Sequence, residues 1–249
     1  MTVALHPALS DPTPFLPFWL LFTRLGEAQV LAPLAVIALL GLWACPAQRD
    51  VAKRWLPAFA AALALTLSSK VAFMGWGIGS AAWDFTGFSG HAMSAASVLP
   101  LIAWLGLQAS TSAPIRAIGL LLSLALAAVI AYSRLPVGAH SPSEAVLGFL
   151  LGATVSGIAL AQPLRAALAG ASSSDASPAR VLRRSALLAL GMAAILSIAP
   201  WASPPTRSHE WVTALSLKLS GRQMPFTRPL LHRRAGEAPI LASARPPAR

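Results

Sequence analysis

The sequence contains little charge, since Asp, Glu, Lys and Arg make up 11% of its 249 residues, whereas about 25% is usual in a soluble domain. Apolar residues make up 56%, which excludes an ordinary water-soluble globular protein. The single cysteine, Cys45, excludes an intramolecular disulfide framework and a cysteine-rich metal site. Asparagine is absent and most basic residues are arginine, a composition typical of a GC-rich bacterial genome.

Acidic residues are the scarcer charge class, with 8 against 19 basic residues and a net charge of +11. Such an excess is common in nucleic-acid-binding proteins. Here the basic residues stand between long uncharged stretches and in the last fifth of the chain, and no Lys/Arg face with interleaved aromatic residues is present that could follow a phosphate backbone. The sequence therefore predicts a lipid bilayer and no nucleic acid as partner.

Long apolar stretches predict an all-α fold, a polytopic membrane protein built as a six-transmembrane-helix bundle. A bilayer core of ~30 Å needs about 20 apolar residues as helix. Six stretches fit this requirement approximately: 28–48, 55–69, 92–115, 117–133, 145–164 and 185–206. A shorter aromatic stretch, 15–22, predicts an interfacial helix. We therefore divide the chain into an N-terminal segment (1–27), a membrane domain (28–201) and a basic, partly disordered tail (202–249).

The distribution of Lys and Arg predicts the orientation of these helices, because cytoplasmic loops retain positive charge. Eight basic residues lie in the loops after the first, third and fifth spans. The loops 70–91 and 133–144 carry only Lys70 and Arg134, so we expect both to face the periplasm or exterior of a bacterial inner membrane. The basic tail does not fit this count, and its side stays open.

Polar residues gather in these two exterior loops. Ionisable groups at a membrane boundary are costly, so their clustering is a functional hypothesis. The first loop contains the segment Ser89-Gly90-His91 at the start of a helix, where backbone N–H groups can bind an anion. The second contains Arg134, His140 and Glu144. A histidine oriented by a carboxylate can act as nucleophile or base, and a guanidinium suits a phosphoryl group.

Structural explanations compete with the functional one at several of these positions. Ser89 can cap the following helix, and Lys70 can extend its amine to the headgroup region. Ser141, Pro142 and Glu144 form a capping box, which by itself gives Glu144 a role without chemistry. Capping leaves His140 unexplained.

Together the motifs resemble the three-part signature of the type 2 phosphatidic acid phosphatase family. Lys70 matches the first part, Ser89-Gly90-His91 the second, and Ser133-Arg134 with His140 the third. The chain departs from the family at three places. Gly77 and Ile78 stand where the family has Arg-Pro, Phe88 replaces a proline, and Glu144 replaces an aspartate.

The resemblance implies a lipid phosphate phosphatase that needs no metal and no other cofactor. His140 would form a phosphohistidine, Glu144 would hold its imidazole, and His91 would protonate the leaving group. The phosphoryl oxygens would be bound by Lys70, Ser89, Gly90 and Arg134. The substrate would be a phosphorylated lipid, with the missing arginine placing phosphate affinity in question.

Two other functions stay open on the sequence alone. Gly87-Phe88-Ser89-Gly90 also fits the Gly-x-Ser-Gly pattern of rhomboid-like intramembrane proteases, in which Ser89 would be the nucleophile. The missing arginine instead favours a homologue that binds lipid and has weak or no activity. The oligomeric state cannot be read from the sequence.

Overall fold

The computed structural model describes residues 15–109, 112–168 and 208–236, together with the single positions 191, 194, 195 and 198. Every regular element in these residues is helical. Four stretches are long and apolar enough to cross a membrane: Leu16–Trp43, Pro46–Trp76, Pro114–Ser133 and Pro142–Ala166. The sixth predicted span, 185–206, lies outside the described residues except for positions 191, 194, 195 and 198.

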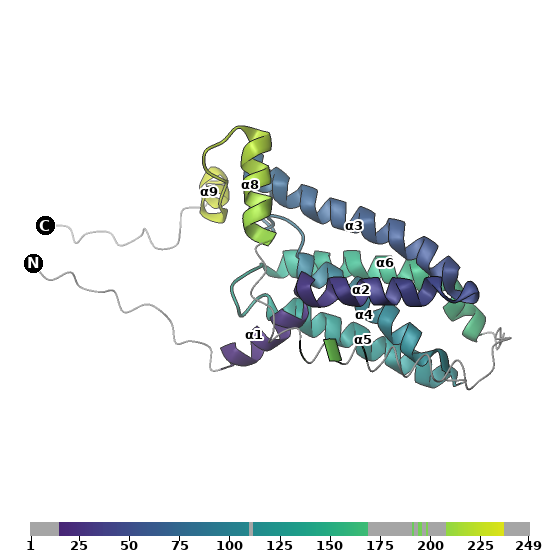
Figure 1. Ribbon diagram of the computed structural model, residues 1–249. Helices are drawn as coiled ribbons and strands as arrows, with labels where there is room; N and C mark the ends of the chain where they lie inside the picture. The colour runs from purple at the N-terminus through teal and green to yellow at the C-terminus, as the bar shows by residue number, and fades with distance from the viewer. Residues whose placement is uncertain are drawn as a thin grey trace, which may run out of the picture.

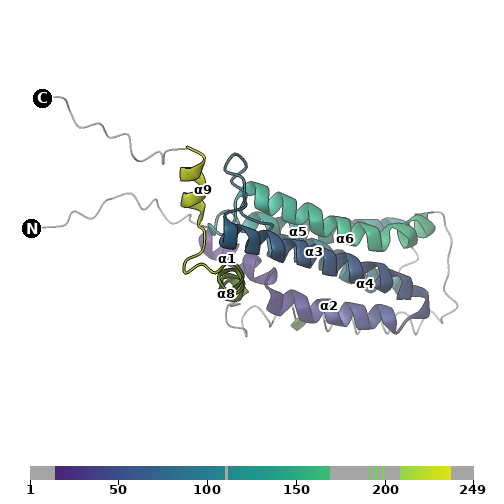
Figure 2. The same cartoon turned by 90° about the horizontal axis from the view of Figure 1, so that it is seen from above.

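Five helices lie roughly side by side, and two more cross one end of them (Figures 1 and 2). The bundle consists of α2 (Ala28–Trp43), α3 (Arg49–Trp76), α4 (Gly90–Gly106), α5 (Ala113–Ser133) and α6 (Pro142–Leu168), with α1 (Leu16–Leu25) preceding it. Across the end of the bundle lie α8 (Ser208–Ser220) and α9 (Arg228–Arg234). The ends of α3 and α5 and the starts of α4 and α6 meet at that same end.

α4 is the centre of the bundle and packs against α2, α5 and α6. Its neighbour α6 approaches closely through small residues. A Cβ on Gly152 would lie 2.1 Å from the Met93 carbonyl oxygen, and a Cβ on Gly148 would lie 2.6 Å from the Ser89 carbonyl oxygen. Such contacts let helix backbones approach where lipid supplies no hydrophobic driving force. They also fix the start of α4 against the start of α6.

The predicted third span, 92–115, is too long. α4 ends at Gly106, a 3₁₀ turn follows at Leu107–Ala109, and α5 begins at Ala113. A polar cluster marks this end, because Gln48 bonds the indole of Trp104 at 3.0 Å and the side chain of Gln108 at 3.1 Å. With 17 residues α4 is shorter than the four candidate spans. By contrast, α3 is longer than the predicted 55–69.

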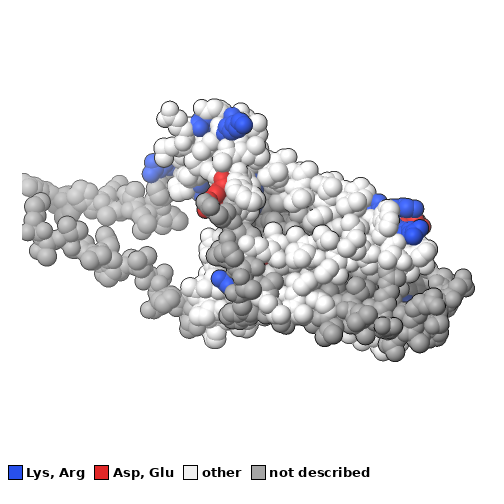
Figure 3. Space-filling model, in the orientation of Figure 1, with Lys and Arg blue, Asp and Glu red and all other residues white. Residues whose placement is uncertain are grey.

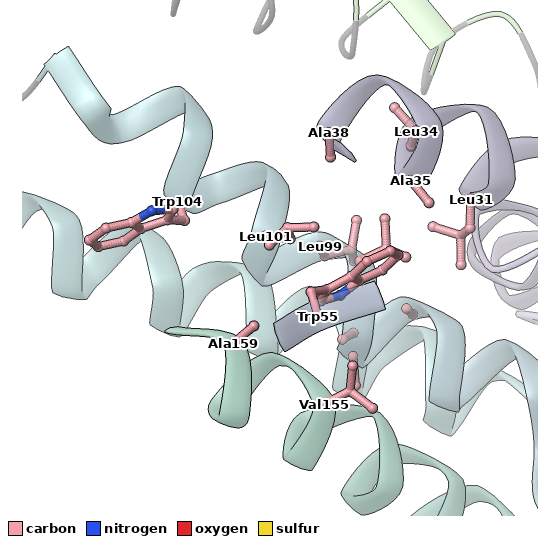
Figure 4. Close-up of a cluster of buried hydrophobic side chains, with 14 of the residues drawn as sticks. Leu31, Leu34, Ala35, Ala38, Trp55, Leu99, Leu101, Trp104, Val155 and Ala159 are labelled. Carbon is pink, nitrogen blue, oxygen red and sulfur yellow. The ribbon is translucent and has the colours of Figure 1, made fainter. Parts of the chain in front are cut away.

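The core surrounds Trp55, which is 1% exposed. Figure 4 shows its ring among side chains from α2, α4 and α6, including Leu31, Leu99 and Val155. Its indole nitrogen donates to the Ser97 carbonyl at 3.0 Å, so the one polar atom of the ring is satisfied.

The outer surface of the bundle is apolar. Large hydrophobic side chains such as Leu121, Leu122 and Leu150 are more than half exposed, as expected for a lipid-facing surface. Figure 3 shows the charged side chains of one face gathered at its two ends, with an uncharged surface between them. Arg49, Asp50 and Lys53, at the start of α3, lie at the end opposite to α8 and α9.

Candidate active site

A cavity of about 780 Å³ lies where the helix ends meet. Its lining contains five of the seven predicted site residues: Lys70, Gly90, His91, Arg134 and His140. They come from the end of α3, the start of α4 and the loop between α5 and α6. The structure thus brings together residues of the two loops 70–91 and 133–144. Among the described lining residues there is no Asp or Glu, so the cavity suits an anion.

Glu144 lies directly behind His140 and is fully buried. The His140 Nδ1 is 2.8 Å from the Glu144 Oε2. Because a carboxylate can only accept, Nδ1 carries the proton in this pair and Nε2 keeps its lone pair. The His140 side chain is 12% exposed and Glu144 is not exposed. Glu144 therefore orients the imidazole of His140 from the buried side, and His140 lines the cavity.

Glu144 also forms the capping box that the sequence predicts. Its Oε2 accepts from the Ser141 backbone N–H at 3.1 Å, and its own N–H donates to the Ser141 hydroxyl at 3.4 Å. The other carboxylate oxygen accepts from Thr86, both from the backbone N–H at 2.7 Å and from the hydroxyl. Capping and orientation of His140 are thus not alternatives, since one buried carboxylate does both.

Burial lowers the pKa of His140 below its usual value. The hydrogen bond that His140 donates to Glu144 opposes this shift, whereas the nearby charges of Lys70 and Arg134 add to it. The neutral imidazole is the form that can act as a nucleophile. A lowered pKa therefore keeps His140 in its reactive form at neutral pH.

Arg134 joins the loop of His140 to α1. Its carbonyl oxygen accepts from the backbone N–H groups of Ala139 at 3.0 Å and His140 at 3.2 Å. Its Nη1 donates to the Thr23 hydroxyl at 3.2 Å. Its buried Nε has no hydrogen-bond partner within the described part of the chain.

Ser89 is placed differently from the other predicted residues. Its side chain is fully buried and accepts from the Ala92 N–H at 3.4 Å, as the N-cap of α4. Its backbone N–H donates to the Glu144 carbonyl at 3.1 Å. Ser89 does not line the cavity, whereas the adjacent Gly90 and His91 do. Ser89 therefore fixes the helix start that presents its two neighbours.

The position of the His91 ring depends on a glycine, Gly26, in the connection between α1 and α2. A Cβ on Gly26 would lie 3.1 Å from the His91 ring carbon Cδ2 and 2.6 Å from Ile130. A larger residue at position 26 would displace one of them. His91, near the start of α4, and His140, in the loop between α5 and α6, thus line the same cavity.

Sequence analysis missed the residues contributed by the C-terminal segment. Arg228, at the start of α9, lines the cavity and donates from Nη2 to the Glu144 Oε2 at 2.9 Å. Its Nη1 bonds the carbonyl and the carboxylate of Asp84, and His232 bonds the same carboxylate at 2.8 Å. No local motif surrounds Arg228, so the sequence contains no signal for it. Asp84 is visible in the first loop but has no predicted role.

No group of three or more His, Cys, Asp or Glu residues is arranged to hold a metal ion within residues 15–168 and 208–236, as far as these are described. The cations of the site are side chains. Together they form a cavity that can hold a tetrahedral anion against a buried, carboxylate-bound histidine.

Comparisons with known proteins agree with this chemistry. A family model described as the PAP2 superfamily matches residues 13–167, more than half of the chain. A curated protein of Klebsiella pneumoniae, described as an uncharacterized 22.5 kDa protein in cps region, is 40% identical over 142 residues, which are 57% of this chain and 68% of that protein. No solved structure matches the chain. The matched residues include every predicted site residue and end before α8.

Proposed function

The chain belongs to the PAP2 superfamily, and from that premise we propose that it is an integral membrane phosphatase that hydrolyses a lipid phosphomonoester or diphosphate through a phosphohistidine. The observation that carries the proposal is the pair His140–Glu144, at 2.8 Å, beside a cavity lined by cations and a second histidine. This arrangement provides a nucleophile, a proton donor and charge stabilisation at one place.

In the proposed reaction the His140 Nε2 attacks phosphorus, the N–P bond forms and the bond to the leaving oxygen breaks. His91 donates a proton to that oxygen. Water then attacks phosphorus, His91 takes the proton of the water, and the N–P bond breaks to release phosphate. Glu144 stabilises the positive phosphohistidine throughout. Lys70, Arg134 and the Gly90 N–H neutralise the phosphoryl oxygens. Ser89 acts through its cap on α4.

The shape of the cavity supports a lipid substrate. Besides its cations, the lining includes Leu63 and Leu67 on α3 and Val212 on α8. Leu63, Leu67 and Lys70 fall on one face of α3 at helical spacing, so an apolar channel continues from the charged end toward the middle of a span. A molecule with a phosphate head and an apolar chain fits both parts. Phosphatidate, phosphatidylglycerophosphate and a polyprenyl diphosphate are such molecules.

The proposed location is a bacterial inner membrane, crossed six times, with the cavity facing the periplasm or exterior. The end of the bundle that holds Arg49, Lys53 and Arg54 would then face the cytoplasm, in agreement with the positive-inside rule. α4 would count as one crossing because it is apolar and central, and 185–206 would supply the sixth. In this arrangement α8 and α9 lie on the exterior side.

Phosphate release in detergent micelles tests the function, with the three lipids above as substrates. We expect release from at least one of them, inhibition by orthovanadate, and a phosphoprotein that is labile in acid. His140→Ala should abolish release and labelling, whereas Thr154→Ala, at an exposed position of α6, should retain both. Release that survives His140→Ala contradicts the mechanism. Lipid binding without any release instead identifies a homologue that has lost activity.

Cleavage of a membrane peptide tests the protease alternative. The buried Ser89 hydroxyl caps its own helix, which is a poor position for a nucleophile. Loss of peptide cleavage in Ser89→Ala, together with full activity in His140→Ala, would establish the protease function instead.

A further inference from the structure

The position of the missing family arginine is occupied by a left-handed glycine. Gly77 ends α3 with φ +73°, and its N–H bonds the Phe73 carbonyl at 2.7 Å. A Cβ at Gly77 would lie 3.0 Å from the Phe226 ring and 3.2 Å from the Arg234 Nη1. Residues with side chains rarely adopt this backbone conformation. An arginine therefore fits neither the backbone nor the space at position 77.

The segment that covers Gly77 is the C-terminal arm, which we define as residues 208–236. The arm packs on the end of α3 through Phe226 and Leu231, which form a buried cluster with Phe73. The Phe226 N–H also donates to the Met74 carbonyl at 2.8 Å. The arm lies outside the residues that the family model matches.

The arm adds Arg228 to the lining of the cavity. Arg228 is the first residue of α9, where the helix dipole disfavours a cation. Nothing in its own helix explains this position. Its interactions are instead with the site: Nη2 lies 2.9 Å from the Glu144 Oε2, which also binds His140, and Nη1 bonds Asp84. Arg228 and the proposed nucleophile, His140, thus bind the same carboxylate oxygen of Glu144.

We propose that Arg228 takes over the function of the arginine missing from the first motif, as the third cation of the phosphate cavity and as a second clamp on Glu144. The proposal rests on the proposed phosphatase function. Without Arg228 the cavity lining keeps two cationic residues, Lys70 and Arg134, and a phosphoryl group in transfer carries charge on three oxygens. Arg228 adds a third Lys or Arg residue to the cavity lining. In this proposal the chemistry of the family is retained because Arg228, on the C-terminal arm, supplies the positive charge that the first motif lacks.

Full-length variants in detergent micelles test this assignment through kinetics. Arg228→Ala should lower kcat/KM by on the order of 10²-fold, the scale of one lost charge-stabilising donor, and millimolar guanidinium should restore part of the activity. Arg228→Lys should retain an intermediate activity, because it keeps the charge without the planar fork. The matched control is Arg233→Ala, which removes an exposed charge from the same helix and should stay within about twofold of wild type, since it has no contact in the cavity.

Binding of orthovanadate to the resting protein separates this proposal from the proposed function. We expect the dissociation constant to rise at least about tenfold in Arg228→Ala and to stay unchanged in Arg233→Ala. Wild-type protein that releases no phosphate from any lipid overturns the phosphatase function alone. Unchanged orthovanadate affinity in Arg228→Ala overturns the assignment of Arg228. A loss of activity that neither guanidinium nor lysine repairs also overturns it, because Arg228 would then serve only to attach the arm.

Discussion

The two sides of the cavity are held in place in different ways. The framework side, formed by Gly90, His91, Arg134 and His140, comes from helix ends within the family-matched region. Its central carboxylate, Glu144, is fully buried. The arm side comes from residues 225–228 and α8, and its ion pair joins Arg228 and Asp84 at 32% and 40% exposure. Buried hydrogen bonds fix the reacting groups, whereas the arm is attached by the buried apolar cluster of Phe73, Phe226 and Leu231 and by an ion pair that is partly solvated.

This difference assigns separate tasks to the two sides. A buried network is rigid, and losing one member leaves charged partners unsatisfied. A partly exposed ion pair is screened by water and contributes less. Changes on the framework side should therefore reduce the rate of the chemical step, and changes on the arm side should mainly alter substrate binding. The predictions below test this division.

Among the changes that test this division, the largest effect is expected from Glu144→Gln. An amide can still cap α6, but it carries no charge to stabilise a phosphohistidine or to pair with Arg228. We expect kcat to fall by about 10³-fold, by analogy with the loss of a carboxylate that orients a catalytic histidine. Steady-state phosphate release measures this. Asp50→Asn, at the opposite end of α3, is the control. A kcat within tenfold of wild type would show that Glu144 only caps the helix.

The framework side could be predicted from the sequence because its signals are local. The spacing of His140 and Glu144, the capping box at Ser141 and the scarcity of basic residues in two loops are all readable along the chain. Alternation of helix direction then places both loops at one end. The burial of Ser89 is different, because it depends on the close approach of Gly148 from another helix.

The arm side could not be predicted because its contacts are remote in sequence. Arg228 and Glu144 are 84 positions apart, and the surrounding segment resembles any basic tail. The break between α4 and α5 was predicted at residue 116, whereas the structure has it at 107–112, and the reason is related. Apolar composition continues across 92–115, and the contacts of Gln48 with Trp104 and Gln108 at the end of α4 join positions that are more than 50 residues apart.

A smaller effect than that of Glu144→Gln is expected from Val212→Trp, which tests whether the arm side selects a lipid chain. Val212 lines the cavity from α8, so an indole there would fill the proposed channel. We expect kcat/KM to fall about tenfold for a long-chain lipid phosphate, an effect within the range for altered apolar pockets. An aryl phosphate without an acyl chain should lose less than about twofold. The control is Leu215→Trp on the same helix, 39% exposed. Equal losses for both substrates would disprove the channel.

A smaller effect is expected from Asp84→Asn, which weakens the attachment of the arm. Asp84 binds Arg228 and His232 and has a left-handed φ of 46°, which asparagine tolerates. Because the pair is partly exposed, we expect KM to rise only about threefold to fivefold with kcat nearly unchanged. Hydrogen exchange of residues 225–234 should become faster. If exchange is unchanged while kcat falls, Asp84 belongs functionally to the framework side.

The smallest effect is expected from a change of pH between 7.5 and 6.5. Burial lowers the pKa of His140 below 6.5, and the nucleophile must be unprotonated. Activity that depends on His140 is therefore complete above its lowered pKa and is lost as the pH falls through it. A histidine with the ordinary pKa would lose about half of its free base at pH 6.5, so kcat should decline by less than that. The second ionisation of a phosphomonoester also lies near pH 6 and could change kcat over the same range. The dependence of kcat on pH must therefore be measured with two substrates whose phosphate groups differ in pKa. If His140 causes the decline of kcat at low pH, the midpoint of that decline lies at the same pH for both substrates. If the ionisation of the substrate causes it, the midpoint differs between the two substrates. Loss of half the activity at pH 6.5 with both substrates would mean that the framework side does not shield His140 from water as its burial implies.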